Sequence, residues 1–176
     1  MFHLSGERPP TREKERPEMG YTHYWYRTEG RGDRLAFQQL GTDARAIIRE
    51  AEAQGIKVAN GLGESMPDFT ETYFAINGRG DESHETFYWP CDVTREIWET
   101  HPSKVFSFTK TAHKPYDAVV CAILIRAKVI YGDALDVSSD GTWAEWIPGR
   151  RLYLVTFDDL APRPFGRDYV DLIGGL

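Results

Sequence analysis

The chain has 176 residues, 41% of them hydrophobic and 13% aromatic, and its formal net charge at pH 7 is −6. This length suits a single domain with a proper core, and the acidic balance argues against a surface that coats nucleic acid without excluding a local basic pocket. The sequence lacks both the roughly 18 apolar residues of a membrane span and the apolar core of a signal peptide, so we expect a cytoplasmic protein with no membrane partner.

Residues 1–19 are polar and contain prolines, and their charges balance between Glu7 and Glu18. Such a segment buries too little apolar surface to offset the entropy lost on ordering. We therefore expect a flexible leader over 1–19 and a single α+β domain over 20–176. Met19 directly precedes an aromatic run and is an alternative start of the chain.

Alternating residues predict strands, and a period of 3.6 predicts helices. The elements expected in the first half are a strand over 21–26, a helix over about 43–54, a short strand over 56–59, and a β-hairpin of 70–77 with 84–90. Thr42 is the expected N-cap of the helix, and an Asn-Gly pair opens the hairpin loop. Alternation in the first strand places Tyr21, His23 and Trp25 on one face.

The elements expected in the second half are one or two helical turns over 94–100, a strand over 105–110, a helix over 115–131 and a strand over 152–157. Pro115 suits the first position of the long helix, and Gly132 suits its end. Residues 118–125 are apolar on every side of this helix, so it belongs deep in the core. Without regular βαβ alternation, the predicted fold is α+β, a mostly antiparallel sheet with two main helices packed on one face.

Two predicted strands carry an aromatic face that ends in a charge. Glu85 shares its face with two aromatic residues of the hairpin, and Lys110 shares its face with Phe106 and Phe108. Both faces are expected to be core-like, and burying an unpaired charge is costly. The two charges therefore either pair with each other or reach solvent at the rim, or they line a cleft where the sheet opens.

The stretch 107–117 joins a predicted strand to the apolar helix and concentrates basic side chains in an acidic chain. A helix N-terminus combines unsatisfied N–H groups with the positive end of the dipole, which favours an anion. We therefore expect a small anionic ligand there, a nucleotide or phosphorylated metabolite, held without a P-loop. The candidate ligand-binding residues, among which Tyr24 or Trp25 offers a stacking surface, are Lys110, Thr111, Lys114, Tyr116, Asp117, His23, Tyr24, Trp25 and Asn77.

Two alternative functions stay open. The first is a hydrolase in which Glu85 works with His84 or His113 as acid–base groups, since histidine titrates near neutral pH. The second is a protein-binding module that contacts a host factor through an aromatic surface carrying Trp143 and Trp146.

Familiar catalytic and metal-binding signatures are missing. The chain contains no HExxH, no GxSxG and neither half of the zinc-deaminase signature. Its two cysteines, Cys91 and Cys121, form no CxxC pattern. Both fit a reducing compartment, and Cys121 is expected to be a small core residue. The sequence therefore predicts no metal site and indicates no cofactor.

Four parts of the chain resemble a family of small hypothetical proteins from tailed bacteriophages and some bacterial genomes. They are 20–25 (GYTHYW), 85–87 (ETF), 110–112 with 114–117 (KTA and KPYD) and 139–141 (SDG). The similarity spans about 20–157 and implies an intracellular role in a phage or prophage setting, in the host cytoplasm if the protein is phage-encoded. It implies no particular activity and assigns no catalytic residue.

Overall fold

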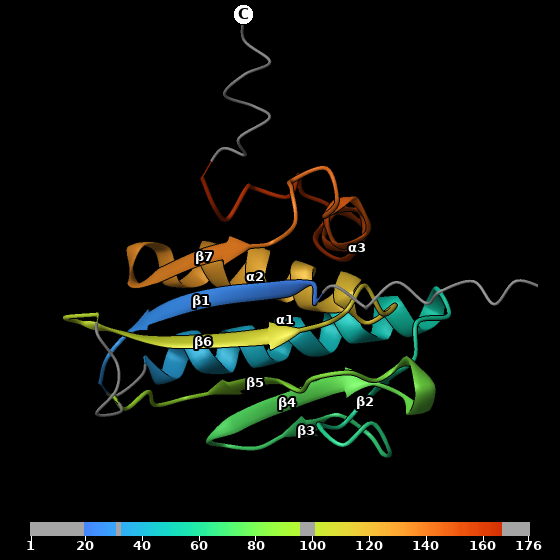
Figure 1. Ribbon diagram of the computed structural model, residues 1–176, viewed down its shortest axis with the longest axis horizontal. Helices are drawn as coiled ribbons and strands as arrows, with labels where there is room; N and C mark the ends of the chain where they lie inside the picture. Colours follow the sequence, from blue (N-terminus) through green and yellow to red (C-terminus); the bar gives the residue numbers. More distant parts are fainter. Residues whose placement is uncertain (1–19, 31–32, 96–100, 167–176) are drawn as a thin grey trace, which may run out of the picture.

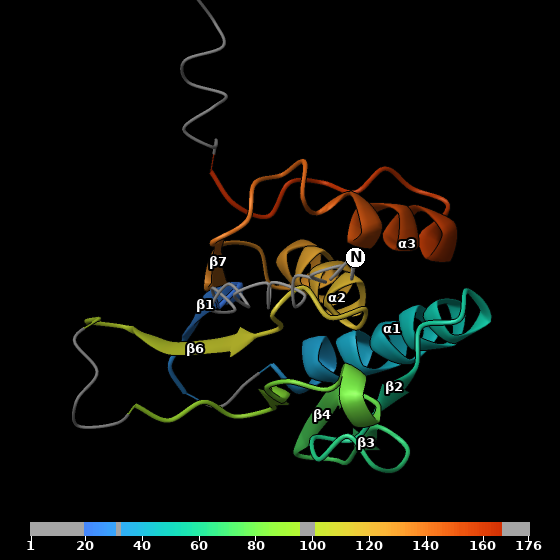
Figure 2. The same ribbon diagram turned by 45° about the vertical axis from the view of Figure 1, so that its right-hand side comes forward.

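A computed structural model describes residues 20–30, 33–95 and 101–166 of the chain. In this part of the chain, three α-helices and two antiparallel sheets form an α+β fold (Figure 1), which confirms the predicted class and adds a third helix to the two expected. Figure 2 shows that the helices lie together on one side of the first sheet. No helix within the described ranges is long and apolar enough to cross a membrane. The predicted leader, 1–19, lies outside the described residues.

The first sheet has the order β6 (Lys104–Lys110), β1 (Thr22–Thr28), β7 (Leu135–Ser139), with antiparallel pairing throughout. Tyr21, His23 and Trp25 are all buried, as the predicted alternation requires. Pairing sets His23 opposite Thr109 on one side and opposite Ser139 on the other. The sequence analysis did not predict β7, which supplies this second neighbour.

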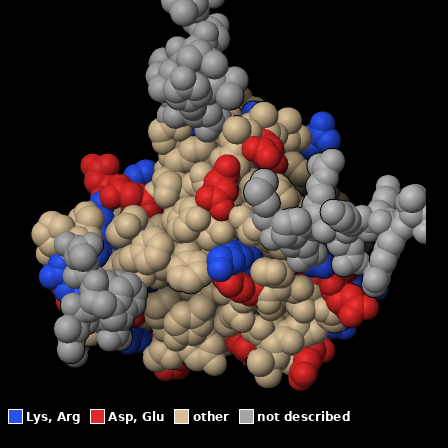
Figure 3. Space-filling view, in the orientation of Figure 1, with Lys and Arg blue, Asp and Glu red and all other residues tan. Residues whose placement is uncertain are grey.

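The other face of this sheet carries partly exposed aromatic side chains. Tyr24, Tyr26 and Phe106 are half-buried there, and Phe108 is 47% exposed. The ring centroid of Phe106 lies 5.0 Å from that of Tyr26 and 5.8 Å from that of Phe108. Figure 3 looks onto this face, where uncharged side chains gather between groups of charged ones. The prediction that Phe106 and Phe108 face the core was therefore wrong, because the buried residues of β6 are Val105 and Thr109, which lie on its other face.

The second sheet is built on β4 (Tyr73–Gly78), which pairs antiparallel with β2 (Val58–Ala59), β3 (Asp68–Phe69) and β5 (Phe87–Pro90). β4 and β5 form the predicted hairpin, whose loop includes the 3-10 turn η1 (Gly80–Glu82). The Asn77 side chain holds this loop. Its NH₂ group donates to the carbonyl oxygens of Gly61 and His84, and its oxygen accepts the N–H groups of Gly78 and His84.

The first helix, α1 (Arg34–Ala53), begins well before the predicted N-cap at Thr42. Its N-cap is Asp33, whose carboxylate accepts the N–H groups two and three residues later at 2.9 and 3.2 Å. Phe37 and Leu40 are buried and continue the apolar stripe toward the N-terminus. Thr42 therefore lies inside the helix, and the prediction was wrong because it started the apolar stripe at Ala44, although the stripe already includes Phe37 and Leu40.

The second helix, α2 (Asp117–Tyr131), begins two residues later than predicted, because 115–116 form a turn that leads into it, so Pro115 does not occupy its first position. Residues 118–125 are buried throughout, as predicted. The turn η2 (Gly132–Ala134) leads from it to β7. The third helix, α3 (Ile147–Phe157), replaces the strand predicted over 152–157, and a proline stands in its first turn. Of the helical turns predicted over 94–100, residues 94 and 95 are not helical and 96–100 lie outside the described residues.

One core cluster contains residues from both sheets and from the helices of the described part. Trp25 of the first sheet stacks on Trp89 of the second, with centroids 5.8 Å apart. The buried guanidinium of Arg27 lies 4.6 Å from the Trp89 ring centroid and donates to two carbonyl oxygens at the end of β5. Between the helices, Arg126 Nε lies 2.7 Å from Asp43 Oδ2. The two sheets and the helices therefore share one interior.

Candidate functional site

The four parts of the chain that carry the family resemblance meet at the end of the first sheet where β6 leads into α2. Asp140 accepts hydrogen bonds from the backbone N–H of Thr22 and the hydroxyl of Tyr24, both at 3.0 Å. Glu85 accepts the backbone N–H of Lys110 at 2.9 Å. Direct hydrogen bonds thus join segments that are far apart in the sequence.

His23 is fully buried at this junction and uses both ring nitrogens. Nε2 lies 2.7 Å from Asp117 Oδ1, and Nδ1 lies 2.9 Å from Ser139 Oγ. The Ser139 oxygen accepts the Gly141 N–H at 2.9 Å and the Trp146 indole N–H at 3.3 Å. The Ser139 proton is then available for Nδ1, which leaves the proton of neutral His23 on Nε2, facing Asp117.

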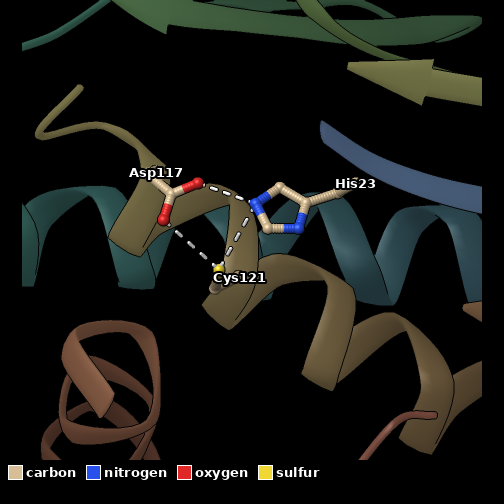
Figure 4. Close-up of side chains that lie close together, drawn as sticks. All are labelled: His23, Asp117 and Cys121. Atoms are coloured by element: carbon tan, nitrogen blue, oxygen red, sulfur yellow. Dashed lines mark hydrogen bonds and ion pairs between the residues drawn. The ribbon is translucent and has the colours of Figure 1, made fainter. Parts of the chain in front are cut away.

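Asp117 lies at the centre of this network (Figure 4). The Thr111 hydroxyl donates to Oδ1 at 2.5 Å, and Cys121 Sγ lies 3.7 Å from Oδ2 and 3.7 Å from His23 Nε2. Asp117 and Cys121 share one face of α2 because they are four residues apart. Burial raises the pKa of the Cys121 thiol well above its usual value, and the Asp117 carboxylate raises it further. The free thiol therefore keeps its proton at neutral pH and is a poor nucleophile.

The Tyr21 side chain adds a second unusual group to the cluster. It is 5% exposed, and its ring meets the His23 ring edge to face at 5.1 Å. Burial raises the pKa of Tyr21 far above its usual value, and the neighbouring Cys121 and Asp117 raise it further. The hydroxyl has no hydrogen-bond partner of good geometry among the described residues. A buried polar group in this state costs about 1–3 kcal/mol, so it needs an explanation.

The N-terminus of α2 meets a carboxylate of the chain itself. The N–H of Asp117 donates to the carbonyl oxygen of Lys114 at 2.9 Å, and the N–H of Val119 donates to that of Tyr116 at 2.9 Å. The Asp117 carboxylate lies in the first turn, where the positive end of the dipole stabilises it. Thr111 and Tyr116 are fully buried. The helix N-terminus, Thr111 and Tyr116, which the sequence assigned to an external anion, therefore make their contacts within the protein.

The two predicted lysines have other partners. Lys110 Nζ lies 3.7 Å from Glu85 Oε1, and both side chains are partly exposed. Lys114 Nζ donates to the carbonyl oxygen of Asp81 at 3.2 Å. Glu85 and Lys110 thus pair at the rim, which is one of the two arrangements left open by the sequence.

Tyr24 and Trp25 lie on opposite faces of β1 and do not form one stacking surface. Trp25 is 1% exposed and packs in the core, whereas Tyr24 is half-buried on the outer face, with its centroid 6.2 Å from that of Phe106. Asn77 is 3% exposed, and its side chain is used by the hairpin loop. Of the predicted ligand-binding residues, the structure brings His23, Thr111 and Asp117 together.

Two of the three predicted acid–base residues contact the backbone of the same residue, and the third lies apart from them. His84 Nδ1 lies 2.9 Å from the carbonyl oxygen of Lys110, and Glu85 accepts the N–H of the same residue. His113 is exposed and stacks on Tyr21, with centroids 3.7 Å apart. His84 and Glu85 therefore brace the end of β6, and within the described residues no hydrogen bond joins His113 to either of them.

Trp143 and Trp146 do not form the exposed patch considered for a protein partner. Trp146 is fully buried, and Phe165 packs on it with centroids 4.9 Å apart. The guanidinium of Arg150 lies 4.5 Å from the ring centroid of Trp143. The exposed aromatic surface lies instead on the outer face of the first sheet.

A hollow with a volume of about 510 Å³ lies between α1 and the strands β3 and β4. The α1 side of its lining includes two exposed arginines, Arg34 and Arg45, together with the polar residue Gln38. The Arg45 guanidinium lies 4.0 Å from the ring centroid of Phe69. Neither arginine forms an ion pair with a described residue. The sequence pattern does not reveal this hollow, because its walls come from elements that meet only in the folded chain.

Comparison of the chain with family models, curated proteins and solved structures finds no significant match.

The sequence pattern also does not reveal the grouping of His23, Asp117 and Cys121. Each of these residues offers one metal-ligand atom, and the three atoms all lie within 4.8 Å of one another. The spacing of Asp117 and Cys121 on one helix face was a visible signal. The third member comes from a strand far away in sequence, and spacing alone cannot reveal it.

Proposed function

We propose that the protein binds a small anionic ligand, a nucleotide or a phosphorylated metabolite, in the hollow between α1 and β3–β4. The observation that carries this proposal is the pair of exposed guanidinium groups of Arg34 and Arg45 in the lining. Glu71, the one acidic residue of the lining, pairs with neither of them. Arginine binds phosphate and carboxylate groups through two parallel hydrogen bonds, so these side chains suit an anion.

The two arginines belong to one stripe of α1. Residues 34, 38, 41, 42 and 45 recur at the helical period and all line the hollow. Arg34 and Arg45 are about three turns apart, roughly 16 Å along the axis, so they suit the two ends of an elongated ligand. Between them, Gly41 leaves the stripe open, since a Cβ atom there would meet nothing within 4 Å.

The aromatic part of the lining supports the same ligand class. The contact between Arg45 and Phe69 holds the guanidinium flat and leaves its N–H edges available to an anion. Phe37 and Phe74 are buried and also line the hollow. Its volume lies within the range of about 300–1,000 Å³ that is typical of small-molecule sites.

The N-terminus of α2, where the sequence predicted the anion, is less favourable for a negative charge than the hollow beside α1. The carboxylates of Asp117, Glu85 and Asp140 outnumber the ammonium groups of Lys110 and Lys114 there. His84 and Glu85 contact the Lys110 backbone and His113 stacks on Tyr21, so the hydrolase alternative has no centre shared by all three residues. The phage-type intracellular setting and a host-protein partner remain expectations that rest on the resemblance and the open aromatic face.

Thermal unfolding in the presence of inorganic phosphate, AMP and ATP tests the proposal. A ligand that binds only the folded chain raises Tm with its concentration. We expect at least one phosphate compound to do so, and Arg45→Gln to remove most of the rise. Arg49→Gln, on the same helix but outside the lining, is the matched control and keeps it. A flat response to all three compounds would overturn the proposal.

Two further variants locate the site. Gly41→Leu fills the hollow without a backbone clash, so we expect a folded protein whose Tm no longer responds to the ligand. The double variant Lys110→Ala with Lys114→Ala should leave the response intact. Loss of the response in the lysine variant but not in Gly41→Leu would place the anion at the head of α2 and contradict the hollow.

A further inference from the structure

We propose that His23, Asp117 and Cys121 form a binding site for one divalent transition-metal ion of the zinc class. Figure 4 shows the His23 side chain reaching from β1 toward Asp117 and Cys121 on successive turns of α2. Their ligand atoms all lie within 4.8 Å of one another. This site is separate from the hollow on α1, so the inference does not depend on the proposed function.

The spacing of the donor atoms is close to that of a tetrahedral zinc site. Zinc binds sulfur at about 2.3 Å and nitrogen or oxygen at about 2.0–2.2 Å, so neighbouring donors lie roughly 3.3–3.6 Å apart. Cys121 Sγ lies 3.7 Å from both His23 Nε2 and Asp117 Oδ2. His23 Nε2 and Asp117 Oδ1 are 2.7 Å apart because they share a hydrogen bond. These two contacts of Asp117 involve different oxygens, so binding through Oδ1 alone requires that Oδ1 and Nε2 separate by roughly 0.6 Å and that Sγ meets Oδ1 in place of Oδ2.

The chemistry of the donors selects the class of metal. A thiolate together with an imidazole favours zinc and its neighbours in the first transition row, whereas magnesium and calcium prefer oxygen donors. Binding releases one proton to solvent, the thiol proton of Cys121, while the single N–H proton of the neutral imidazole leaves Nε2 for Nδ1. The Asp117 side chain is 16% exposed, so the cluster is not sealed from the surface.

The Tyr21 hydroxyl, whose contact with Ser139 falls short of good hydrogen-bond geometry, bears on the same site. When Nε2 of His23 binds a metal, the imidazole proton moves to Nδ1 and is donated to Ser139 Oγ. The Ser139 hydroxyl proton then needs another acceptor. The buried Tyr21 oxygen, which lies near Ser139 and lacks a good partner among the described residues, can accept it. Metal binding would therefore turn the weak contact between Ser139 and Tyr21 into a hydrogen bond of good geometry.

Titration of the purified full chain with Co²⁺ under reducing conditions tests the site. Cobalt takes zinc positions and gives an absorption band from thiolate-to-cobalt charge transfer, which reports the sulfur ligand directly. We expect one equivalent of Co²⁺ to produce this band, Zn²⁺ to remove it by displacement, and a chelator to abolish it. These measurements need no variant, so a folding defect cannot obscure them.

Three variants identify the ligands. Cys121→Ser should lose the charge-transfer band, whereas Cys91→Ser, which alters the other buried cysteine, should keep it. Ser139→Ala should keep the band and weaken Co²⁺ affinity about 10–100-fold, the effect of removing a group that orients a metal-bound histidine. The absence of a band in the wild-type chain would overturn the inference, as would a band that survives in Cys121→Ser or disappears in Cys91→Ser.

Discussion

Tyr21 and Tyr116 are both buried near the β6–α2 junction, and only one of them has a well-bonded hydroxyl. The Tyr116 O–H donates to the carbonyl oxygen of Glu85 at 2.8 Å. The Tyr21 hydroxyl lacks such a partner within the described ranges. A buried hydroxyl stabilises the fold when it is bonded and destabilises it when it is not. The two residues therefore form a matched pair on which the polar network can be tested.

Tyr116→Phe should lower the free energy of unfolding by about 1–2 kcal/mol, because it removes the 2.8 Å donor of the Glu85 carbonyl oxygen and leaves only the longer bond from the Thr109 hydroxyl at 3.3 Å. Tyr21→Phe should change the stability of the metal-free protein by less than about 0.5 kcal/mol, since it removes only an unbonded hydroxyl. Urea unfolding with a chelator present measures both. Equal losses in the two variants would contradict the assignment of hydrogen bonds at this junction.

At the scale of the elements, the helices of the described part contain glycines with opposite surroundings. Gly41 lies inside α1, where a Cβ atom would meet nothing within 4 Å. Gly149 lies in α3 against α2, where a Cβ atom would collide with Cys121 Cβ and lie 3.0 Å from the carbonyl oxygen of Ala118. The first glycine lowers helix propensity without a packing role, whereas the second allows two helices to approach closely.

Gly41→Ala should raise the free energy of unfolding by about 0.5–1 kcal/mol through helix propensity. Gly149→Ala should lower it by about 1–3 kcal/mol, because α3 must move away from α2 to admit the methyl group. Chemical denaturation of the two variants beside the wild type gives both values. A stabilising Gly149→Ala would mean that α3 does not pack on α2 as closely as described.

For the molecule as a whole, the shared interior couples buried ionisable groups to global stability. Trp25 and Trp89 join the two sheets, and α2 passes through the same core. Tyr21 and Tyr116 are part of this interior, and burial raises the pKa of each above the usual value near 10. Because the raised pKa belongs to the folded state, the neutral hydroxyls persist there at pH values that ionise them in the unfolded chain.

We therefore expect the free energy of unfolding to fall as the pH rises above about 10. In that range the folded state holds more protons than the unfolded state, and each tyrosine contributes a slope of at most about 1.4 kcal/mol per pH unit. Urea unfolding between pH 8 and pH 11 measures the slope. Tyr21→Phe removes one titrating group without breaking a good hydrogen bond, so its slope should be smaller. An identical slope in this variant would argue against the burial of Tyr21.

Local patterns in the sequence were sufficient for much of the fold. The α+β class, the buried face of β1, the β4–β5 hairpin and the position of α2 follow from alternation, turn residues and a continuous apolar run, all of which act between near neighbours. The wrong predictions are those in which the types of neighbouring residues suggested a different structure from the one that forms. Phe106 and Phe108 are aromatic but lie on the outer face, and residues 152–157 are β-branched and aromatic in part but pack as a helix against α2.

The candidate sites depended on contacts between distant segments. The composition of residues 107–117 alone indicated a functional site there. The structure shows that Asp117 of this stretch bonds to His23 from β1, which in turn bonds to Ser139 from β7, so these polar groups face the interior and not an external ligand. The lining of the arginine hollow likewise joins α1 to β3 and β4. A buried polar group must find a partner, and which partner it finds depends on the packing of the whole chain. Sequence patterns therefore determined the elements and their buried faces, while long-range packing determined which side chains meet.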